Sequence, residues 1–168
     1  MKPSKKQIKV LIVGFGPLGR QIYSDLKKKD NIEVVGVADI SPEISGKDCG
    51  DLCGIGVKTG ITVRANIDFE KKSADAAIIT SVSDVKSIYS QIEKVANLGI
   101  NIISTCEELT YPWINSPELS QKINSMAKNN SIFVLSTGVN PGFLMDFLPL
   151  IMTGVCKNIE SIDIKRYQ

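Results

Sequence analysis

The sequence contains no histidine and only four cysteines in 168 residues, which excludes several kinds of active site. Without histidine, a Ser-His-Asp or Cys-His hydrolase has no general base. The cysteines are too few and too scattered for a disulfide framework, so we expect free thiols. We expect no zinc site and no other metal site, because there is also no close cysteine pair. The four are Cys49, Cys53, Cys106 and Cys156.

Long apolar runs and an excess of one charge are absent as well. No stretch approaches the roughly 18 apolar residues of a membrane helix, and the basic start at residues 2–6 lacks the apolar region of a signal peptide. With 20 Lys+Arg against 18 Asp+Glu, the net charge of +2 gives no electrostatic reason to bind nucleic acid. We therefore expect a cytoplasmic protein that engages neither membranes nor nucleic acid.

The apolar residues that are present form short runs separated by amphipathic segments. This alternation is typical of βα units on a parallel sheet. Runs that are apolar throughout indicate strands buried on both faces. The sequence therefore predicts an α/β, Rossmann-type, doubly wound and mostly parallel sheet. Its strands are expected at residues 8–13, 32–37, 76–80, 100–104 and 132–136.

The segments between these runs carry helix patterns. The strongest places apolar residues on one stripe over residues 85–96, with Ser83 or Asp84 as the cap and Gly99 at the end. A second pattern follows Pro117 and closes at residues 129–130. For the first helix we expect Leu18, Ile22 and Leu26 to face the core. Residues 40–62, which are rich in glycine, predict a long ordered loop with one helical turn.

A glycine motif lies between the first strand and the first helix. Gly14, Gly16 and Gly19 match G-x-G-x-x-G, in which the glycines permit a tight turn, close approach to a pyrophosphate and close packing of the helix. The helix N-terminus offers free N–H groups to phosphates, and Pro17 is tolerated there. Arg20 contacts either a phosphate or only solvent. The cofactor contacts expected in this segment are Gly14, Gly16, Pro17, Leu18, Gly19 and Arg20.

An acidic residue completes the dinucleotide pattern. Asp39 ends the second strand, where a carboxylate binds the adenosine ribose and repels a 2′-phosphate. The following residues Ile40 and Ser41 include no arginine that would attract that phosphate. The expected cofactor is therefore NAD or NADP, with NAD favoured by Asp39, and Ser41 is a further expected contact.

Polar loops follow the later strands, at the edge where ligands of such sheets bind. Glu107 and Glu108 are either first-turn residues favoured by a helix dipole or a general base beside the nicotinamide. Cys106 is expected mainly to pack, since a nucleophilic thiol needs a base. Asn140 precedes a proline and forms either a simple turn or a pocket wall and hinge. The cofactor contacts expected in these loops are Thr80, Ser81, Thr105, Cys106 and Asn140.

Two of these loops carry a family resemblance. Residues 104–109 read Ser-Thr-Cys-Glu-Glu-Leu, and residues 138–143 read Gly-Val-Asn-Pro-Gly-Phe. Together with the Gly-Asp-Leu-Cys-Gly of residues 50–54, they resemble the 2,4-diaminopentanoate dehydrogenase family. That family lies in a larger group related to dihydrodipicolinate reductase and including native amine dehydrogenases. The resemblance spans nearly the whole chain.

The resemblance implies an NAD(P)-dependent oxidative deamination of a small primary amine, 2,4-diaminopentanoate, to 2-amino-4-oxopentanoate and ammonia. It also implies that a glutamate of the Cys-Glu-Glu loop, Glu108 or else Glu107, takes a proton from the substrate. Family members have a second domain that completes the substrate pocket and the oligomer interface. We therefore expect residues 1–155 to be the N-terminal cofactor domain, inactive alone, and residues 156–168 to be a first strand or linker toward an absent domain. The full-length protein is then expected to be a homo-oligomer.

Two other readings remain open. A dihydrodipicolinate reductase-type enzyme has the same glycine loop, although the paired glutamates argue against it. A stand-alone NAD-sensing module would explain the short chain, but it leaves Glu107, Glu108 and Asn140 without a role.

Overall fold

The chain is described by a computed structural model that covers residues 7–140, 142–165 and 167. Strands and helices alternate along most of it, as the sequence predicts. A 3₁₀ turn, Glu107–Leu109, and a π-helical turn, Phe143–Phe147, interrupt the alternation. The strands and α-helices are β1 (Ile8–Val13), α1 (Pro17–Leu26), β2 (Ile32–Ala38), α2 (Cys49–Leu52), β3 (Val63–Arg64), β4 (Ala76–Ile79), α3 (Val85–Asn97), β5 (Asn101–Ser104), α4 (Pro117–Asn129), β6 (Val134–Ser136) and α5 (Leu148–Thr153).

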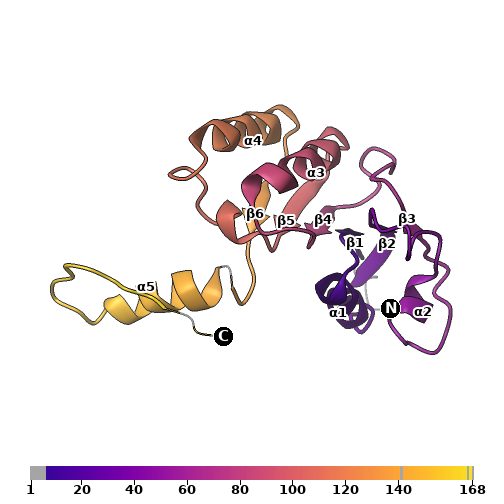
Figure 1. Ribbon diagram of the computed structural model, residues 1–168, viewed down its shortest axis with the longest axis horizontal. Coiled ribbons are helices and arrows are strands. Elements are labelled where there is room, and N and C mark those ends of the chain that lie inside the picture. The colour runs from indigo at the N-terminus through magenta and orange to yellow at the C-terminus, as the bar shows by residue number, and fades with distance from the viewer. Residues whose placement is uncertain (1–6, 141, 166, 168) are drawn as a thin grey trace, which may run out of the picture.

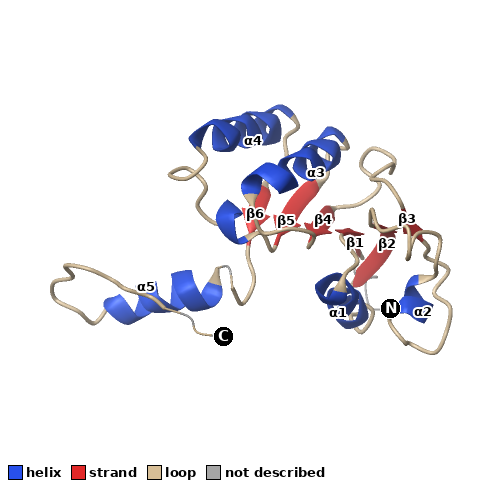
Figure 2. Ribbon diagram, in the orientation of Figure 1, coloured by secondary structure: helices blue, strands red, loops and turns tan. Residues whose placement is uncertain are grey.

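The six strands form one sheet in the order β3-β2-β1-β4-β5-β6, and every pair is parallel. The chain therefore starts in the middle of the sheet, winds outward through β2 and β3, and then returns to the other side of β1 (Figure 2). The point between β1 and β4, where the winding reverses, is where ligands of doubly wound sheets bind. This topology confirms the predicted Rossmann-type fold.

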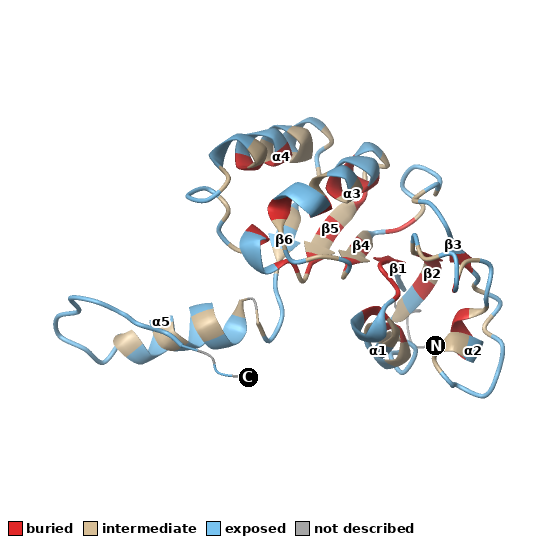
Figure 3. Ribbon diagram, in the orientation of Figure 1, coloured by how far each residue is buried: buried red, intermediate tan, exposed pale blue. Residues whose placement is uncertain are grey.

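Helices cover the two faces of the sheet unequally. Figure 1 shows α3 and α4 on one face and α1 with α2 on the other. Alternate residues of β1 point to opposite faces, so Leu11 belongs to the core under α3 and α4, whereas Ile12 belongs to the core under α1. Both residues are fully buried, and the last four residues of β1 are all buried (Figure 3).

Helix α3 forms as its apolar stripe predicts. Ile88 and Ile92 are buried, and each such side chain contributes about 1.5–3 kcal/mol when it leaves water. Asp84 caps the helix, since its Oδ1 accepts a hydrogen bond from the Ser87 N–H at 2.8 Å. Gly99, at φ +69°, follows the last turn in the left-handed conformation that favours glycine.

Two details differ from the sequence expectations. Leu18 is not a core residue of α1, because it is 48% exposed, and the buried positions are Gly19 and Tyr23 instead. Ile22 and Leu26 pack against the core as expected, and Gly19 lies with its backbone against the preceding loop. The two-residue strand β3 was not expected, since it is too short to show a pattern. The single turn α2 within residues 40–62 confirms the predicted loop with one helical turn.

After β6 the chain forms an arm, defined here as residues 143–153, that projects from the sheet (Figure 1). Most of its apolar side chains are exposed. Residues 156–165, which belong to the segment expected as a first strand or linker, have no regular secondary structure. Ile162 and Ile164 alternate with polar residues in this segment. Alternating isoleucines need a neighbouring strand to pair with, and none lies beside them among the described strands. The domain boundary at residue 155 stays a prediction.

Candidate functional site

The residues that directly follow the strands form one row along the carboxyl edge of the sheet. Each donates its backbone N–H to the last residue of a neighbouring strand, which continues the ladder by one step. The row therefore brings together Gly14, Asp39, Thr80 and Thr105, which the sequence predicted as separate loop residues. The five hydrogen bonds are Asp39 N to Arg64 O (2.9 Å), Gly14 N to Ala38 O (2.8 Å), Thr80 N to Val13 O (2.8 Å), Thr105 N to Ile79 O (3.1 Å) and Thr137 N to Ser104 O (2.9 Å).

The three glycines of the motif meet different surroundings. Gly14 has φ +91°, and a Cβ on it would lie 2.9 Å from the backbone nitrogen of Ser81. A Cβ on Gly19 would overlap the carbonyl oxygen of Gly14. Gly16 has an ordinary φ of −69° and no atom within 4 Å of where a Cβ would lie. Folding therefore requires two of the glycines, whereas the third keeps a space open above the loop.

That open space lies at the N-terminus of α1. No side chain caps this terminus, Gly16 is its N-cap residue and Pro17 is in its first turn. The first N–H groups of the helix are thus available to an anion. Leu18 is exposed beside them. Because a Cβ at Gly16 would fill the space that a pyrophosphate needs, the loop fits a dinucleotide.

Arg20 is attached to the loop itself. Its Nε donates a hydrogen bond to the carbonyl oxygen of Phe15 at 3.1 Å, and the side chain is half-buried. The guanidinium therefore lies against the glycine loop and is not simply a solvated surface group. A contact between the Arg20 guanidinium and a phosphate stays a prediction.

Asp39 connects two loops. One carboxylate oxygen accepts a hydrogen bond from the Phe15 N–H of the glycine loop, and the other accepts one from the Ser41 N–H at 2.8 Å. Ser41 thus meets Asp39 through its backbone. Asp39 is half-buried at the carboxyl end of β2, the position from which a ribose-binding carboxylate acts.

The hydroxyl groups of the two residues that follow β4 form hydrogen bonds within the protein. Thr80 donates its Oγ1 proton to the carbonyl oxygen of Gly14 at 2.8 Å, and Ser81 donates to Oε1 of Gln91 at 2.7 Å. The expected contacts of these residues with a nicotinamide ribose stay predictions. Sequence reasoning missed that Thr80 supports the glycine loop, because this hydrogen bond joins positions 66 residues apart.

The turn after β5 places two carboxylates at the N-terminus of α3. Oε2 of Glu108 accepts a hydrogen bond from the Val85 N–H at 3.0 Å, and the Glu108 N–H donates to the Ser83 carbonyl at 3.2 Å. Glu107 is exposed on the same turn. Glu108 therefore stabilises a helix terminus, and both glutamates are exposed to solvent. The role of either carboxylate as a general base stays a prediction.

Cys106, just before this turn, is fully buried. Its backbone carbonyl accepts a hydrogen bond from the Ser136 hydroxyl at 2.6 Å, and burial raises the pKa of its thiol. These features suit a packing residue and not a nucleophile. A direct contact between Cys106 and a cofactor would require this turn to move.

The loop after β6 is closed on itself. Gly142 has φ +101°, its N–H donates to Asp146 at 2.9 Å, and the Leu144 N–H donates to Val139 O at 2.8 Å. Asn140 lies half-buried within this loop, and Pro141 lies outside the described residues. A cavity of about 510 Å³ adjoins it, lined by Thr137, Gly138, Val139, Gly142, Phe143 and Phe147. Residue Asp146 was not expected to hold the loop, since its role depends on the π-helical turn.

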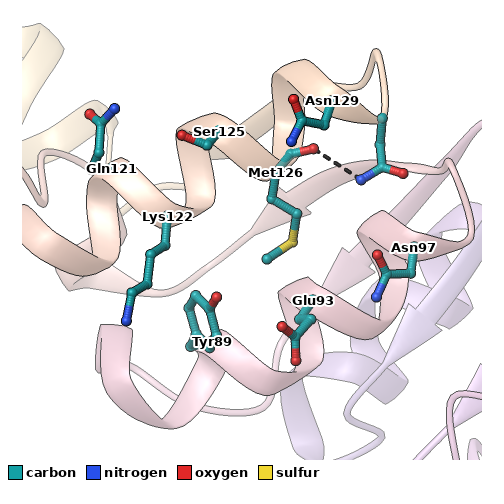
Figure 4. A pocket seen from close by; sticks show the side chains of 9 residues that line it. Tyr89, Glu93, Asn97, Gln121, Lys122, Ser125, Met126 and Asn129 are labelled. Atoms are coloured by element: carbon teal, nitrogen blue, oxygen red, sulfur yellow. Dashed lines mark hydrogen bonds between the residues drawn. The ribbon is translucent and has the colours of Figure 1, made fainter.

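A second cavity, of about 420 Å³, lies between α3 and α4 and contains none of the expected site residues (Figure 4). Figure 4 shows Tyr89 and Glu93 on α3 facing Lys122 and Met126 on α4. Within the described part of the chain, no cluster of three or more His, Cys, Asp or Glu side chains could hold a metal ion. In the same residues, no helix has the length and apolar character needed to cross a membrane.

Three known proteins resemble this chain along most of its length. 2,4-Diaminopentanoate dehydrogenase from Acetoanaerobium sticklandii is 34% identical over 164 residues, which are 96% of this chain and 46% of that protein. The structure of amine dehydrogenase from Mycobacterium smegmatis superposes with a TM-score of 0.83 at 30% identity, covering 90% of this chain and 45% of that one. An engineered D-amino acid dehydrogenase bound to NADP⁺ shares the fold, with a TM-score of 0.63 at 23% identity over 89% of this chain and 42% of that one.

The chain thus spans about half the length of the relatives it matches. The family model for the N-terminus of dihydrodipicolinate reductase matches residues 8–137, from the first residue of β1 to the residue that follows β6. This match includes the glycine loop, Asp39 and the Glu107–Glu108 turn. The chain therefore belongs to the family of dihydrodipicolinate reductase N-terminal domains.

Proposed function

We propose that the chain is the cofactor-binding domain of an NAD(P)-dependent dehydrogenase that oxidises a primary amine. The observation that carries the proposal is the glycine loop, which is open at Gly16 above an uncapped helix N-terminus. Asp39 and the Glu107–Glu108 turn follow strands of the same sheet edge. The 34% identity to a 2,4-diaminopentanoate dehydrogenase and the TM-score of 0.83 to an amine dehydrogenase support the amine as the substrate class.

The proposed reaction converts 2,4-diaminopentanoate to 2-amino-4-oxopentanoate and ammonia. A bound oxidised dinucleotide supplies the hydride acceptor. A glutamate carboxylate of the turn after β5 removes a proton from the substrate ammonium, which frees the nitrogen lone pair to expel hydride from the adjacent carbon. The resulting iminium carbon is attacked by water, and the carbon–nitrogen bond then breaks to release ammonia.

The two glutamates are separable by experiment. Glu108 can act as the base through the carboxylate oxygen that does not accept the Val85 N–H, and Glu107 is exposed next to it in the chain. In the complete gene product, Glu→Gln at the base should lower kcat about 100-fold or more while the Kd for the cofactor is unchanged. Substitution of the other glutamate should change kcat far less. Equal, small effects of E107Q and E108Q would overturn the assignment of a base to this turn.

The cofactor part is tested directly on the 168-residue chain. Separate calorimetric titrations with NAD⁺ and NADP⁺ should show binding of both, with NAD⁺ tighter because Asp39 repels a 2′-phosphate. An Asp39→Ala variant should narrow the difference between the two dissociation constants. If neither nucleotide binds the wild-type chain, the proposed cofactor site is wrong for this chain.

The family match favours one other activity, reduction by a dihydrodipicolinate reductase-type enzyme. The complete gene product separates the two readings, because one oxidises an amine with NAD(P)⁺ and the other oxidises NAD(P)H with dihydrodipicolinate. Turnover of dihydrodipicolinate alone would replace the amine proposal.

A further inference from the structure

One peptide group of the glycine loop is held at both ends by side chains from different strands. The Gly14 carbonyl accepts the Thr80 hydroxyl proton at 2.8 Å, and the next N–H, that of Phe15, donates to the Asp39 carboxylate. These two atoms belong to the same planar trans peptide, in which C=O and N–H point in opposite directions. Any rotation of this peptide breaks both hydrogen bonds together.

The contacts around Gly14 restrict the orientation of the Gly14–Phe15 peptide. Its own N–H is bound to Ala38 O at 2.8 Å, and Ser81 packs within 2.9–3.1 Å of where a Cβ would lie. Gly19 lies so close to the Gly14 carbonyl that only glycine fits there. Among these contacts, it is the Thr80 side chain that donates a hydrogen bond to the Gly14 carbonyl.

We propose that Thr80 is a positioning residue for cofactor selection, acting through the Gly14–Phe15 peptide on Asp39. The inference rests on the proposed function, in which this loop binds a dinucleotide. Thr80 orients the peptide, the peptide N–H fixes one oxygen of Asp39, and the Ser41 N–H fixes the other. The carboxylate is thereby held in one direction toward the adenosine ribose. Thr80 thus contributes to the preference for NAD⁺ through the Gly14 carbonyl and not by a contact of its own with the adenosine ribose.

The test replaces Thr80 with valine, which keeps the shape of the side chain and removes the donor. Loss of one such hydrogen bond should weaken NAD⁺ binding to the 168-residue chain about five- to tenfold. NADP⁺ binding should change less, so the ratio of the two dissociation constants narrows. Thr80→Ser keeps the hydroxyl and should restore both the NAD⁺ affinity and the ratio.

A double-mutant cycle shows whether the effect passes through Asp39. Because Thr80 acts through the carboxylate, Thr80→Val should add little to the loss of NAD⁺ affinity already caused by Asp39→Asn. In an NMR spectrum without nucleotide, the Phe15 amide signal should shift in Thr80→Val and return in Thr80→Ser.

Ser120→Ala is the matched control, since it removes another hydroxyl-to-carbonyl hydrogen bond, from buried Ser120 to Ser116 O at 2.7 Å in α4. It should leave both affinities and the Phe15 signal unchanged. Additive effects in the cycle, or an unchanged ratio in Thr80→Val, would overturn the role of Thr80 alone. Failure of the wild-type chain to bind either nucleotide would overturn the proposed function together with it.

Discussion

One row of neighbouring residues shows that the two halves of the sheet are covered differently. Ile12, Ile78, Ile103 and Leu135 are partners in register on β1, β4, β5 and β6, so their side chains point to the same face. Ile12 is fully buried, whereas Leu135 is 49% exposed, with the other two between these limits. Residues of similar size and polarity thus differ in burial because α1 covers the centre of this face and no described helix covers its β6 end (Figure 1).

The covered half is also the half that holds the dinucleotide motif. The glycine loop and Asp39 follow β1 and β2, whose side chains pack beneath α1. The less covered half leads into the arm, whose apolar residues face solvent. A binding site that depends on fixed backbone directions is therefore built where both faces of the sheet are packed.

The largest effect should be the difference in stability loss between two variants, Ile12→Ala and Leu135→Ala. Ile12→Ala removes a fully buried side chain and should lower the free energy of unfolding by about 2–5 kcal/mol. Leu135→Ala should cost less than about 1 kcal/mol, because half of that side chain is already in water. Urea unfolding followed by circular dichroism measures both. Similar losses for the two variants would mean that another surface covers Leu135 in solution.

A smaller effect should separate the two kinds of glycine in the loop. Gly19→Ala places a Cβ against the Gly14 carbonyl and should cost about 1–3 kcal/mol of stability. Gly16→Ala meets no neighbouring atom and should leave stability within about 0.5 kcal/mol of wild type, yet weaken NAD⁺ binding more than about tenfold. Thermal unfolding and calorimetry, run on both variants, test this difference. Tight NAD⁺ binding by Gly16→Ala would show that the open space is not the pyrophosphate site.

The smallest effect concerns the pH dependence of stability, and it compares the half-buried Asp48 with the exposed Asp163. The Asp48 carboxylate accepts N–H groups of Gly50, Thr59 and Gly60, and these bonds, led by that of Thr59, hold its pKa below the ordinary 3.8. A lowered carboxyl pKa gives stability that is present above the unfolded pKa and is lost as pH falls through the folded one. Wild type should therefore lose stability in acid more steeply than Asp48→Asn does.

An exposed ion pair in residues 156–165 provides the control for this pH effect. Asp163 pairs with Lys165 at 2.6 Å, but both side chains are largely in solvent, where such pairs contribute little. Asp163→Asn should follow the wild-type stability curve from neutral pH into acid. A steeper acid loss in Asp48→Asn than in wild type would contradict the assigned cause.

The contrast between local and distant contacts also explains what the sequence could predict. The glycine loop and the α3 caps were predictable because each depends on residues close together in the chain. Asp39 was predictable because an acidic residue at the end of the second strand is part of the dinucleotide pattern. Apolar spacing indicated Leu18, Ile22 and Leu26 as the core face of α1, but Leu18, in the first turn, is exposed. The hydrogen bonds from Thr80 to Gly14 and from Val85 to Glu108 join residues 66 and 23 positions apart. No sequence pattern predicts either contact.

The central position of β1 has a consequence for the order of folding. Its pairing with β2 closes a short loop, and the Phe15–Asp39 bond spans 24 positions. Its pairing with β4, and the Thr80–Gly14 bond with it, must close a loop of 66 positions at a higher entropic cost. We expect β1, α1 and β2 to assemble first, so the glycine loop exists early in folding with its carbonyl still unsupported. Nucleotide should then favour only the later species in which β4 has docked, and so should slow unfolding without speeding the first step of folding.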